Sequence, residues 1–223
     1  MSTVVVKVGG NAALDGTALG LVRDLAAAHN VVVVHGAGPQ ITQEMERRGL
    51  PVTFVGGRRV TSLEALEIVR DAYTGINKRL CRMLGEAAVG LFGDEIGLRA
   101  EAVPELGLVG EALPSRPHAI VTALTEGQIP VVAPLAEGPL NVNADDAATV
   151  LALGLGAARI VFVSDVPGLL RHGAVVSQIG SREAHRLLAA GELEGGIVPK
   201  LQAAVTAARL GVRAEIGETL VLA

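Results

Sequence analysis

Residues 31–41 read VVVVHGAGPQI, a run of four valines followed by a glycine-rich turn and a helix-forming segment. An aliphatic run without polar alternation is typical of a strand buried on both faces, as in parallel sheets. Gly36 and Gly38 suit a tight turn, and the helix predicted for residues 39–48 ends at Gly49. A strand, a short turn and a helix form the repeating unit of an α/β sheet.

The same alternation of strands and helices continues along the chain. Strands are predicted at residues 3–8, 87–92, 129–133 and 159–163, and helices at residues 17–28, 119–126, 144–155, 182–190 and 200–210. Thr61 followed by Glu64 resembles a capping box, which predicts that another helix begins there. Glycine-rich residues 97–110 and the surroundings of Gly173 indicate hairpins, and Gly217 separates two short final strands. The pattern predicts an α/β fold with a mainly parallel sheet.

Composition limits the class of protein. The 223 residues suffice for one large domain or two closely joined lobes, and a 50% hydrophobic content with 2% aromatic residues requires an aliphatic core. A net charge of -4 provides no basic surplus for nucleic acid. Cys81 is the only cysteine, and the sequence has neither the pattern of a signal peptide nor an apolar run of membrane-spanning length. We therefore expect a cytoplasmic protein without nucleic-acid or membrane partners.

Ligands of parallel α/β sheets collect at the carboxyl ends of the strands. Lys7 interrupts a valine run near such an end and is followed by Gly9 and Gly10. A buried ammonium group needs an anionic partner, but a lysine near a strand end can also extend its tip into solvent. The sequence leaves both interpretations open.

The turn after the valine run is a candidate anion site. Gly36, Ala37 and Gly38 connect a strand to a helix, where backbone N–H groups meet the positive end of the helix dipole. The dinucleotide fingerprint needs a further glycine where Ile41 stands, and the sequence has no phosphate-loop motif. A plain tight turn explains the same residues.

Arg58 and Arg59 lie in a loop before a predicted helix. A guanidinium group binds a carboxylate through two parallel hydrogen bonds, which a lysine cannot do. The alternative is a pair of solvent-exposed arginines near Glu64 and Glu67.

Lys200 follows Pro199, which suits the first position of a helix. A lysine in the first turn opposes the helix dipole, and its presence is explained if an anion lies between the two. The alternative is a surface lysine with a small unfavourable effect on stability.

Residues 140–150 read LNVNADDAATV and place amide and carboxylate side chains at the start of a helix. Asn143 and Asp145 suit capping positions. Capping does not explain Asn141, nor the coexistence of this cluster with isolated lysines at other strand ends. A catalytic role is therefore the second interpretation.

Eight motifs occur in the order and at about the spacing found in one enzyme family: VVVKVGGN, VVVVHGAGPQI, GGRRVT, INKRL, LGLVGEAL, LNVNADDAA, VSDVPGLL and GGIVPKLQAA. By these motifs the chain resembles the N-acetylglutamate kinases of the amino acid kinase superfamily over nearly its whole length. NVNAD and GGIVPKL are specific to that family, whereas the glycine-rich turns are shared more widely. The resemblance implies a three-layer α/β/α sandwich forming one domain, with residues 1–155 for substrate and dimerisation and residues 156–223 for nucleotide.

The activity implied by the resemblance is transfer of the γ-phosphoryl group of ATP to the side-chain carboxylate of N-acetyl-L-glutamate, in arginine biosynthesis. A carboxylate is already ionised, so the reaction needs no general base but does need help in bringing two anions together. Phosphoryl transfer depends mainly on positioning and charge neutralisation. Mg²⁺ is expected to be held mainly by phosphates and water, so no protein ligand to a metal is implied.

Roles for individual residues also follow from the resemblance. Lys7 and Lys200 stabilise the transferring phosphoryl group, Asp145 orients both ammonium groups, and Arg59 binds the α-carboxylate of the substrate. The implied substrate-binding residues are Gly10, Ala37, Gly38, Arg59, Asn141 and Asn143. The implied nucleotide-binding residues are Gly9, Asp165, Val166, Pro167, Gly168, Leu169, Leu170, Glu192, Leu193 and Glu194.

The sequence departs from the family pattern in three places. The family usually has a glycine where Ala37 stands, which matters if that position requires a positive φ. Relatives usually carry a further helix after residues 212–216, where this chain continues to GETLVLA. Arginine-inhibited hexameric relatives carry an additional N-terminal helix, so the resemblance implies the arginine-insensitive kind and a homodimer.

Two other functions fit the same fold. A related kinase phosphorylates glutamate or aminoadipate attached to an acidic carrier protein, although HGAGPQI and LGLVGEAL look more like the enzyme for a free substrate. A non-catalytic amino-acid or nucleotide sensor is the other alternative. The presence of Lys7, Asp145 and Lys200 together argues against a sensor.

Overall fold

A computed structural model describes residues 1–12, 16–163 and 167–223. In this part of the chain, eight strands form a central sheet in the order β14-β16-β15-β11-β1-β2-β8-β5. The strands are β1 Thr3–Val8, β2 Asn30–His35, β5 Ala88–Phe92, β8 Ile129–Ala133, β11 Arg159–Phe162, β14 Gln178–Gly180, β15 Arg213–Ile216 and β16 Thr219–Leu222. Neighbouring strands are parallel except β15 and β16, which confirms a mainly parallel sheet.

Helices cover both faces of the central sheet. The apolar core on one face includes side chains from α1 Gly16–Ala26, α2 Gly38–Arg47 and α3 Leu63–Leu84. The core on the other face includes side chains from α5 His118–Thr125, α6 Ala144–Gly154, α7 Ser181–Ala189 and α8 Ile197–Arg209. Within β1, Val5 faces the second core, whereas Val4 and Val6 face the first. Strands buried on both faces explain the uninterrupted valine runs, and the three-layer α/β/α sandwich is confirmed.

Smaller sheets and turns surround the central sheet. In the described residues, a second sheet has the order β6-β7-β10-β9, and two hairpins pair β3 with β4 and β12 with β13. The hairpins predicted within residues 97–110 and around Gly173 are present. These short elements are β3 Phe54–Val55, β4 Arg58–Arg59, β6 Ala100–Ala102, β7 Val109–Ala112, β9 Leu135–Ala136, β10 Leu140–Val142, β12 Leu170–Arg171, β13 Ala174–Val175, α4 Gly93–Ile96 and the 3₁₀ turn η2 Pro104–Leu106.

Two helix starts differ from the sequence prediction. The N-cap of α3 is Ser62, whose hydroxyl accepts a hydrogen bond from the backbone N–H of Ala65, so the capping box assigned to Thr61 is wrong. Thr61 and Ser62 are both good capping residues, and the adjacent one is used. Helix α8 begins at Ile197 and not at Pro199. A proline is tolerated throughout the first helical turn, where backbone N–H groups have no partner within the helix.

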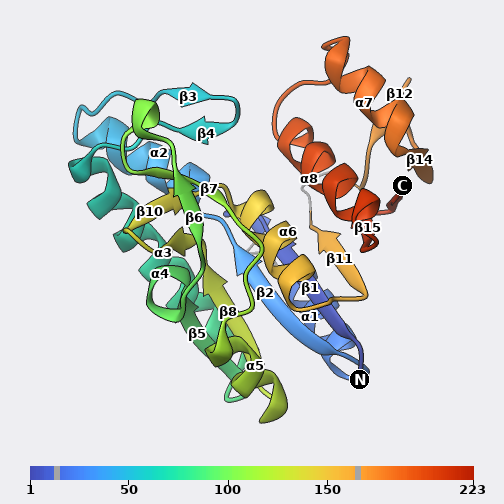
Figure 1. The fold of residues 1–223 in the computed structure, drawn as a ribbon, viewed down its shortest axis with the longest axis horizontal. Coiled ribbons are helices and arrows are strands. Elements are labelled where there is room, and N and C mark those ends of the chain that lie inside the picture. The colour runs from blue at the N-terminus through green and yellow to red at the C-terminus, as the bar shows by residue number, and fades with distance from the viewer. Residues whose placement is uncertain (13–15, 164–166) are drawn as a thin grey trace.

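Strand β1 lies at the point where the strand order reverses. The chain passes from β1 to β2 on one side, whereas β11 pairs with β1 on the other. Ligands of open α/β sheets bind beyond the carboxyl ends of the strands at such a point. The β3–β4 hairpin and the helices α7 and α8 lie at this end of the molecule, away from the N-terminus (Figure 1). No helix in the described residues is long and apolar enough to cross a membrane.

Candidate active site

Two adjoining cavities lie beyond the carboxyl end of β1. The first has a volume of about 440 Å³, and most of its lining residues lie beyond residue 155. The second has a volume of about 340 Å³ and is lined mainly by residues before 155, including Lys7, Arg59 and Asp145. Gly9, Gly196 and Lys200 line both cavities. The two cavities are therefore continuous at these residues.

Lys7 and Asp145 form a buried ion pair in the second cavity. The Lys7 Nζ atom lies 2.9 Å from Asp145 Oδ1, and each side chain is 6% exposed. Lys7 has the same orientation along β1 as Val5, toward the face covered by α6, and Asp145 is in the first turn of that helix. Asp145 Oδ1 receives no well-aligned hydrogen bond from the described residues, so the contact is a Coulombic pair. The solvent-directed interpretation of Lys7 is wrong, and the anionic partner required by burial is Asp145.

The start of α6 divides capping and charge pairing between two residues. The Asn143 side chain accepts hydrogen bonds from the backbone N–H groups of Asp145 at 2.8 Å and Asp146 at 3.4 Å. Asn143 also donates to the carbonyl oxygen of Gly57 at 3.3 Å, which links this helix to the β3–β4 hairpin. Asn143 is thus the cap, whereas the Asp145 carboxylate is left for Lys7.

Asn141 connects β10 to the segment that carries Arg59. Its side-chain nitrogen donates to the Thr61 hydroxyl at 3.0 Å, and that hydroxyl donates to the Arg59 carbonyl oxygen at 2.7 Å. Both hydrogen bonds are buried. Thr61 therefore links Asn141 to the segment that carries Arg59 and does not cap α3.

Arg59 is buried beside the turn that ends β2. Its Nη2 atom donates to the Gly38 carbonyl oxygen at 3.1 Å and to the Thr42 hydroxyl at 2.8 Å. The guanidinium carbon lies 4.6 Å from the centre of the Phe54 ring, and burial lowers the pKa of Arg59. Among the described residues no carboxylate forms an ion pair with Arg59. The solvent-exposed interpretation is wrong for Arg59.

Arg58 differs from Arg59 in having carboxylate partners. Its Nη2 atom lies 3.3 Å from Glu111 and 3.8 Å from Asp146. Its side chain is about a quarter exposed, and Glu64 and Glu67 are not its partners. Of the two adjacent arginines, only Arg59 is both buried and without a carboxylate in the described part of the chain.

The glycine-rich turns bring backbone close to the second cavity. A Cβ atom on Gly10 would lie 2.6 Å from Gln40 Oε1 and 3.1 Å from Ala37 Cα, so a larger residue would have to displace the Gln40 amide and would crowd the neighbouring turn. Ala37 has a φ of −147°, so this position does not need the positive φ that would favour glycine. The Gly36 N–H bonds to the Val8 carbonyl oxygen at 2.9 Å, which joins the ends of β1 and β2.

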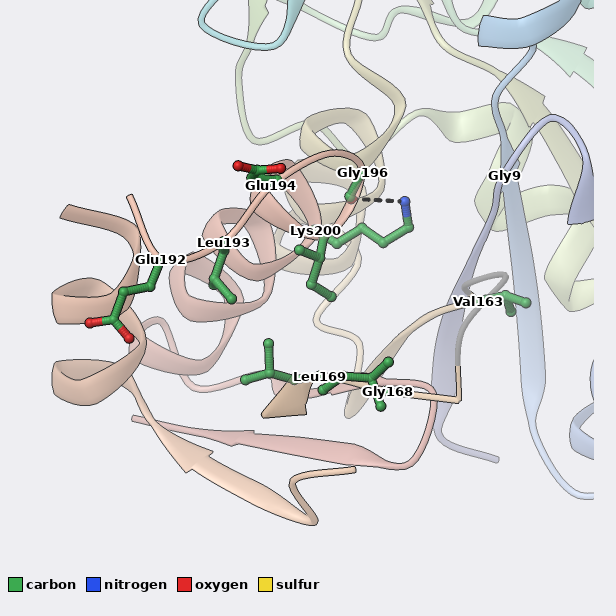
Figure 2. Close-up of a pocket in the computed structure, with 11 residues that line it drawn as sticks. Gly9, Val163, Gly168, Leu169, Glu192, Leu193, Glu194, Gly196 and Lys200 are labelled. Carbon is green, nitrogen blue, oxygen red and sulfur yellow. Dashed lines mark hydrogen bonds between the residues drawn. The ribbon is translucent and has the colours of Figure 1, made fainter. Parts of the chain in front are cut away.

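Lys200 lies in the first turn of α8, at the junction of the two cavities. Its ammonium group donates to the Gly196 carbonyl oxygen at 3.2 Å, and the side chain is partly exposed. Figure 2 shows the side chain extending from α8 across the cavity toward the side on which Gly9 lies. A cation at the positive end of a helix is unfavourable by itself and favourable when an anion occupies the adjoining cavity.

The first cavity contains most of the residues predicted to bind the nucleotide. Its lining includes Gly9, Gly168, Leu169, Leu170, Glu192, Leu193 and Glu194. Leu169 and Leu193 lie on opposite sides of the cavity in Figure 2. Asp165 and Val166 lie outside the described residues. Pro167 does not line the cavity, and its carbonyl oxygen accepts a hydrogen bond from the Glu218 N–H at 2.6 Å.

Several lining residues are not identified by the sequence analysis. In the first cavity these are Val163, Gly196 and Ile197, and in the second they include Phe54 and Tyr73. Gly196 and Ile197 come shortly before Pro199 and belong to the same motif, GGIVPKLQAA. Nothing in the neighbouring sequence marks Phe54 or Tyr73 as a ligand-binding residue, because single aromatic residues are common in hairpins and on the packed faces of helices. In the described residues no three His, Cys, Asp or Glu side chains gather closely enough to hold a metal ion.

His35, at the end of β2, is buried next to the second cavity. Asn77 donates to the Val131 carbonyl oxygen at 2.8 Å and its side-chain nitrogen lies 3.2 Å from His35 Nε2. Since that nitrogen is a donor, His35 Nε2 acts as an acceptor and the ring is neutral, with its proton on Nδ1 facing the Gly36 carbonyl oxygen at 3.4 Å. Burial lowers the pKa of His35 to about 4.

The unfolding free energy should decrease as the pH decreases because of His35. Its folded-state pKa of about 4 lies below its ordinary value of 6.5, so the unfolded chain binds a proton first as the pH decreases. The stabilisation is complete above pH 6.5 and is lost toward pH 4, by about 2 kcal/mol between pH 7 and pH 4.5. Urea titrations of the wild type and of His35→Gln will measure the difference in slope. Equal pH dependence in the two proteins would show that His35 is not responsible.

Comparison with known proteins agrees with this geometry. Residues 2–217 match the model of the amino acid kinase family. An acetylglutamate kinase from Rubrobacter xylanophilus is 42% identical, over 97% of this chain and 88% of that protein. An acetylglutamate kinase from Geobacillus kaustophilus is 39% identical, over 92% of this chain and 85% of that protein.

Solved structures show the same architecture. The crystal structure of smu.665 from Streptococcus mutans has a TM-score of 0.88 and 28% identity, over 99% of this chain and 98% of that one. Carbamate kinase from Giardia lamblia bound to AMP-PNP shares the fold, with a TM-score of 0.66 and 14% identity over 99% and 98% of the two chains. With a family match over nearly its whole length and relatives of this similarity, the chain belongs to the amino acid kinase family.

Proposed function

We propose that this chain is an acetylglutamate kinase, which transfers the γ-phosphoryl group of ATP to the side-chain carboxylate of N-acetyl-L-glutamate. The observation that carries the proposal is the continuity of the two cavities at Gly9, Gly196 and Lys200. We assign ATP to the first cavity, on the lobe of residues 156–223, and the acceptor to the second, on the lobe of residues 1–155. The transferring group then lies between Lys7 and Lys200.

The reaction needs charge neutralisation more than proton transfer. A side-chain carboxylate oxygen attacks the γ-phosphorus of ATP, the bond from that phosphorus to the bridging oxygen breaks, and ADP leaves with the electron pair. Lys7 and Lys200 offset the negative charge shared by the attacking, transferring and leaving oxygens. Asp145 holds the Lys7 ammonium in place before the substrates arrive, which avoids reorganisation during the reaction. Mg²⁺ bound with ATP would supply further charge neutralisation at the phosphates, and the described residues include no group of three His, Cys, Asp or Glu side chains that would hold it directly.

Substrate orientation comes from the opposite wall of the second cavity. Arg59 binds the α-carboxylate, because it is a buried guanidinium without a carboxylate partner in the described residues. Asn141 and the backbone N–H groups of Gly10 and Gly38 provide further polar contacts in the same cavity. These contacts aim the distal carboxylate toward Lys7 and the γ-phosphate.

Hydroxylamine trapping tests the proposed reaction. An acyl phosphate reacts with hydroxylamine to form a hydroxamate, so ATP and N-acetylglutamate should yield one hydroxamate per ADP. Glutamate, aspartate, N-acetylaminoadipate and a glutamate linked to an acidic carrier protein serve as competing acceptors. Preference for the carrier-linked acceptor would replace the free-substrate proposal, and nucleotide binding without any hydroxamate would indicate a sensor.

Replacement of Arg59 by lysine should raise KM for N-acetylglutamate by about 10- to 100-fold, because a charge-assisted hydrogen bond contributes about 1.5–3 kcal/mol. KM for ATP should change little, since Arg59 does not line the first cavity. Arg58→Lys is the matched control, because a lysine retains charge pairing with Glu111 and Asp146. A larger effect at Arg58, or equal changes in both KM values, would place the substrate elsewhere.

We also propose a homodimer, the assembly that the sequence resemblance to the arginine-insensitive N-acetylglutamate kinases implies. Light scattering should give twice the chain mass of 22.8 kDa. A mass of one chain would contradict this assembly.

A further inference from the structure

Tyr73 occupies an unusual position on the buried face of α3. Its companions on this face are aliphatic, at the spacing expected for a helix that packs on a sheet: Leu66, Val69, Ile76 and Leu80. Tyr73 is 4% exposed and also lines the second cavity. Apart from Asn77, the other buried residues of α3 are apolar, so Tyr73 places a phenol on a mainly hydrocarbon face.

The ring of Tyr73 packs against His35, which Asn77 in turn positions. The ring centres of His35 and Tyr73 are 5.7 Å apart, with an angle of 79° between the planes, which is an edge-to-face arrangement. His35 is itself positioned by Asn77, whose side chain also bonds to the backbone of β8. The orientation of the Tyr73 ring is thus set by His35 on β2, and His35 is itself positioned by Asn77, which is anchored on β8.

The Tyr73 hydroxyl forms no hydrogen bond to any other described residue. Tyr73 lines the second cavity, and its hydroxyl oxygen is not among the fully buried side-chain atoms that lack a partner. A tyrosine hydroxyl in such a position usually finds a hydrogen-bond partner. Burial raises the pKa of Tyr73, and the nearby Arg59 guanidinium offsets this only in part. The phenol is consequently neutral and available as a donor at the cavity wall.

Arg59 shares the second cavity with Tyr73. Two protein acceptors occupy its Nη2 atom, the Gly38 carbonyl oxygen and the Thr42 hydroxyl. The second cavity thus contains a buried cation, Arg59, and a neutral hydrogen-bond donor, the Tyr73 hydroxyl, which has no partner in the described part of the chain. Together they suit an anionic ligand group that has several acceptor oxygens. A carboxylate has this chemistry, because each of its two oxygens accepts hydrogen bonds.

We propose that Tyr73 is a specificity-determining residue whose hydroxyl donates a hydrogen bond to the α-carboxylate bound by Arg59. The inference deepens the proposed function and rests on it for the identity of the substrate. It explains why a phenol, and not another aliphatic side chain, stands at this position of α3. It also gives His35 and Asn77 a role in positioning the Tyr73 ring.

The test compares two acceptors in the wild type and in Tyr73→Phe. N-acetylglutamate carries the α-carboxylate, whereas 4-acetamidobutanoate keeps the acetamide and the distal carboxylate but lacks it. From hydroxamate rates, Tyr73→Phe should lower kcat/KM for N-acetylglutamate about tenfold, the low end for a hydrogen bond to a charged group. It should leave kcat/KM for 4-acetamidobutanoate unchanged within about twofold, because this acceptor has no α-carboxylate to which the Tyr73 hydroxyl could donate.

Equal losses with both acceptors, or no loss with N-acetylglutamate, would overturn the role of Tyr73. Thr74→Ala is the matched control, since it removes a hydroxyl from the adjacent position of α3 that bonds to the Arg70 carbonyl oxygen outside both cavities. If the wild type forms no hydroxamate, the proposed function fails separately. In that case, calorimetric measurement of N-acetylglutamate binding tests Tyr73 directly. We expect Tyr73→Phe to bind N-acetylglutamate about tenfold more weakly than the wild type does. Unchanged binding would contradict the inference.

Discussion

Replacing Lys7 with methionine should lower kcat by about 10²- to 10³-fold, the effect of removing one preorganised group that stabilises transition-state charge. The same change should destabilise the fold by about 3–5 kcal/mol, because it leaves the Asp145 carboxylate buried without its partner. A loss of activity in this variant alone would therefore not distinguish a catalytic lysine from a structural one.

The double variant Lys7→Met with Asp145→Asn separates the two roles. Removing both charges eliminates the unpaired buried ion, so the unfolding free energy should recover to near the wild-type value. The cap of α6 is unaffected, because Asn143 provides it. Urea titration and hydroxamate rates on the same samples measure both quantities. Turnover should stay about 10²- to 10³-fold below wild type. Recovery of turnover together with stability would show that the ion pair is structural only.

Replacing Lys200 with alanine should also lower kcat by about 10²- to 10³-fold, since the ammonium group lies where the two cavities meet. Stability should change little, because Lys200 is partly exposed and a cation does not favour the start of a helix. The comparison of melting temperature with kcat thus isolates the catalytic effect. Near-normal kcat in this variant would leave Lys200 as a surface residue.

Lys78→Ala provides the matched control for Lys200. Lys7, Lys78 and Lys200 are the only lysines of the chain. Lys78 is exposed on α3 and lines neither cavity, so its loss should leave kcat and both KM values unchanged. An effect at Lys78 comparable to that at Lys200 would indicate a general electrostatic influence and not a contact with the phosphoryl group.

The sequence predicts the central sheet because valine runs buried on both faces differ clearly from amphipathic strands. It also identifies Lys7 as exceptional, because a cation interrupts such a run. Whether the Lys7 ammonium group points into solvent or pairs with a carboxylate is decided only by the structure. The partner, Asp145, lies far along the chain on another element, and the local pattern equally suggests a cap for that residue.

Other parts of the site have no local signature. Tyr73 falls at a regular apolar position of α3, so periodicity classifies it as core. The sequence misplaces the start of α3 by one residue because Thr61 and Ser62 are both suitable caps. The junction between the cavities unites Gly9 with Gly196 and Lys200, and this proximity follows from the sheet order and not from spacing.

The most direct test of the proposed reaction follows an oxygen atom from the acceptor to phosphate. N-acetylglutamate labelled with ¹⁸O in its side-chain carboxylate is incubated with the enzyme, ATP and hydroxylamine. If the carboxylate attacks the γ-phosphorus, hydroxylamine later attacks the acyl carbon and releases phosphate that keeps one ¹⁸O atom, visible as an isotope shift in the ³¹P spectrum. Phosphate formed with ADP but without ¹⁸O would contradict phosphorylation of the carboxylate and show that water accepts the phosphoryl group.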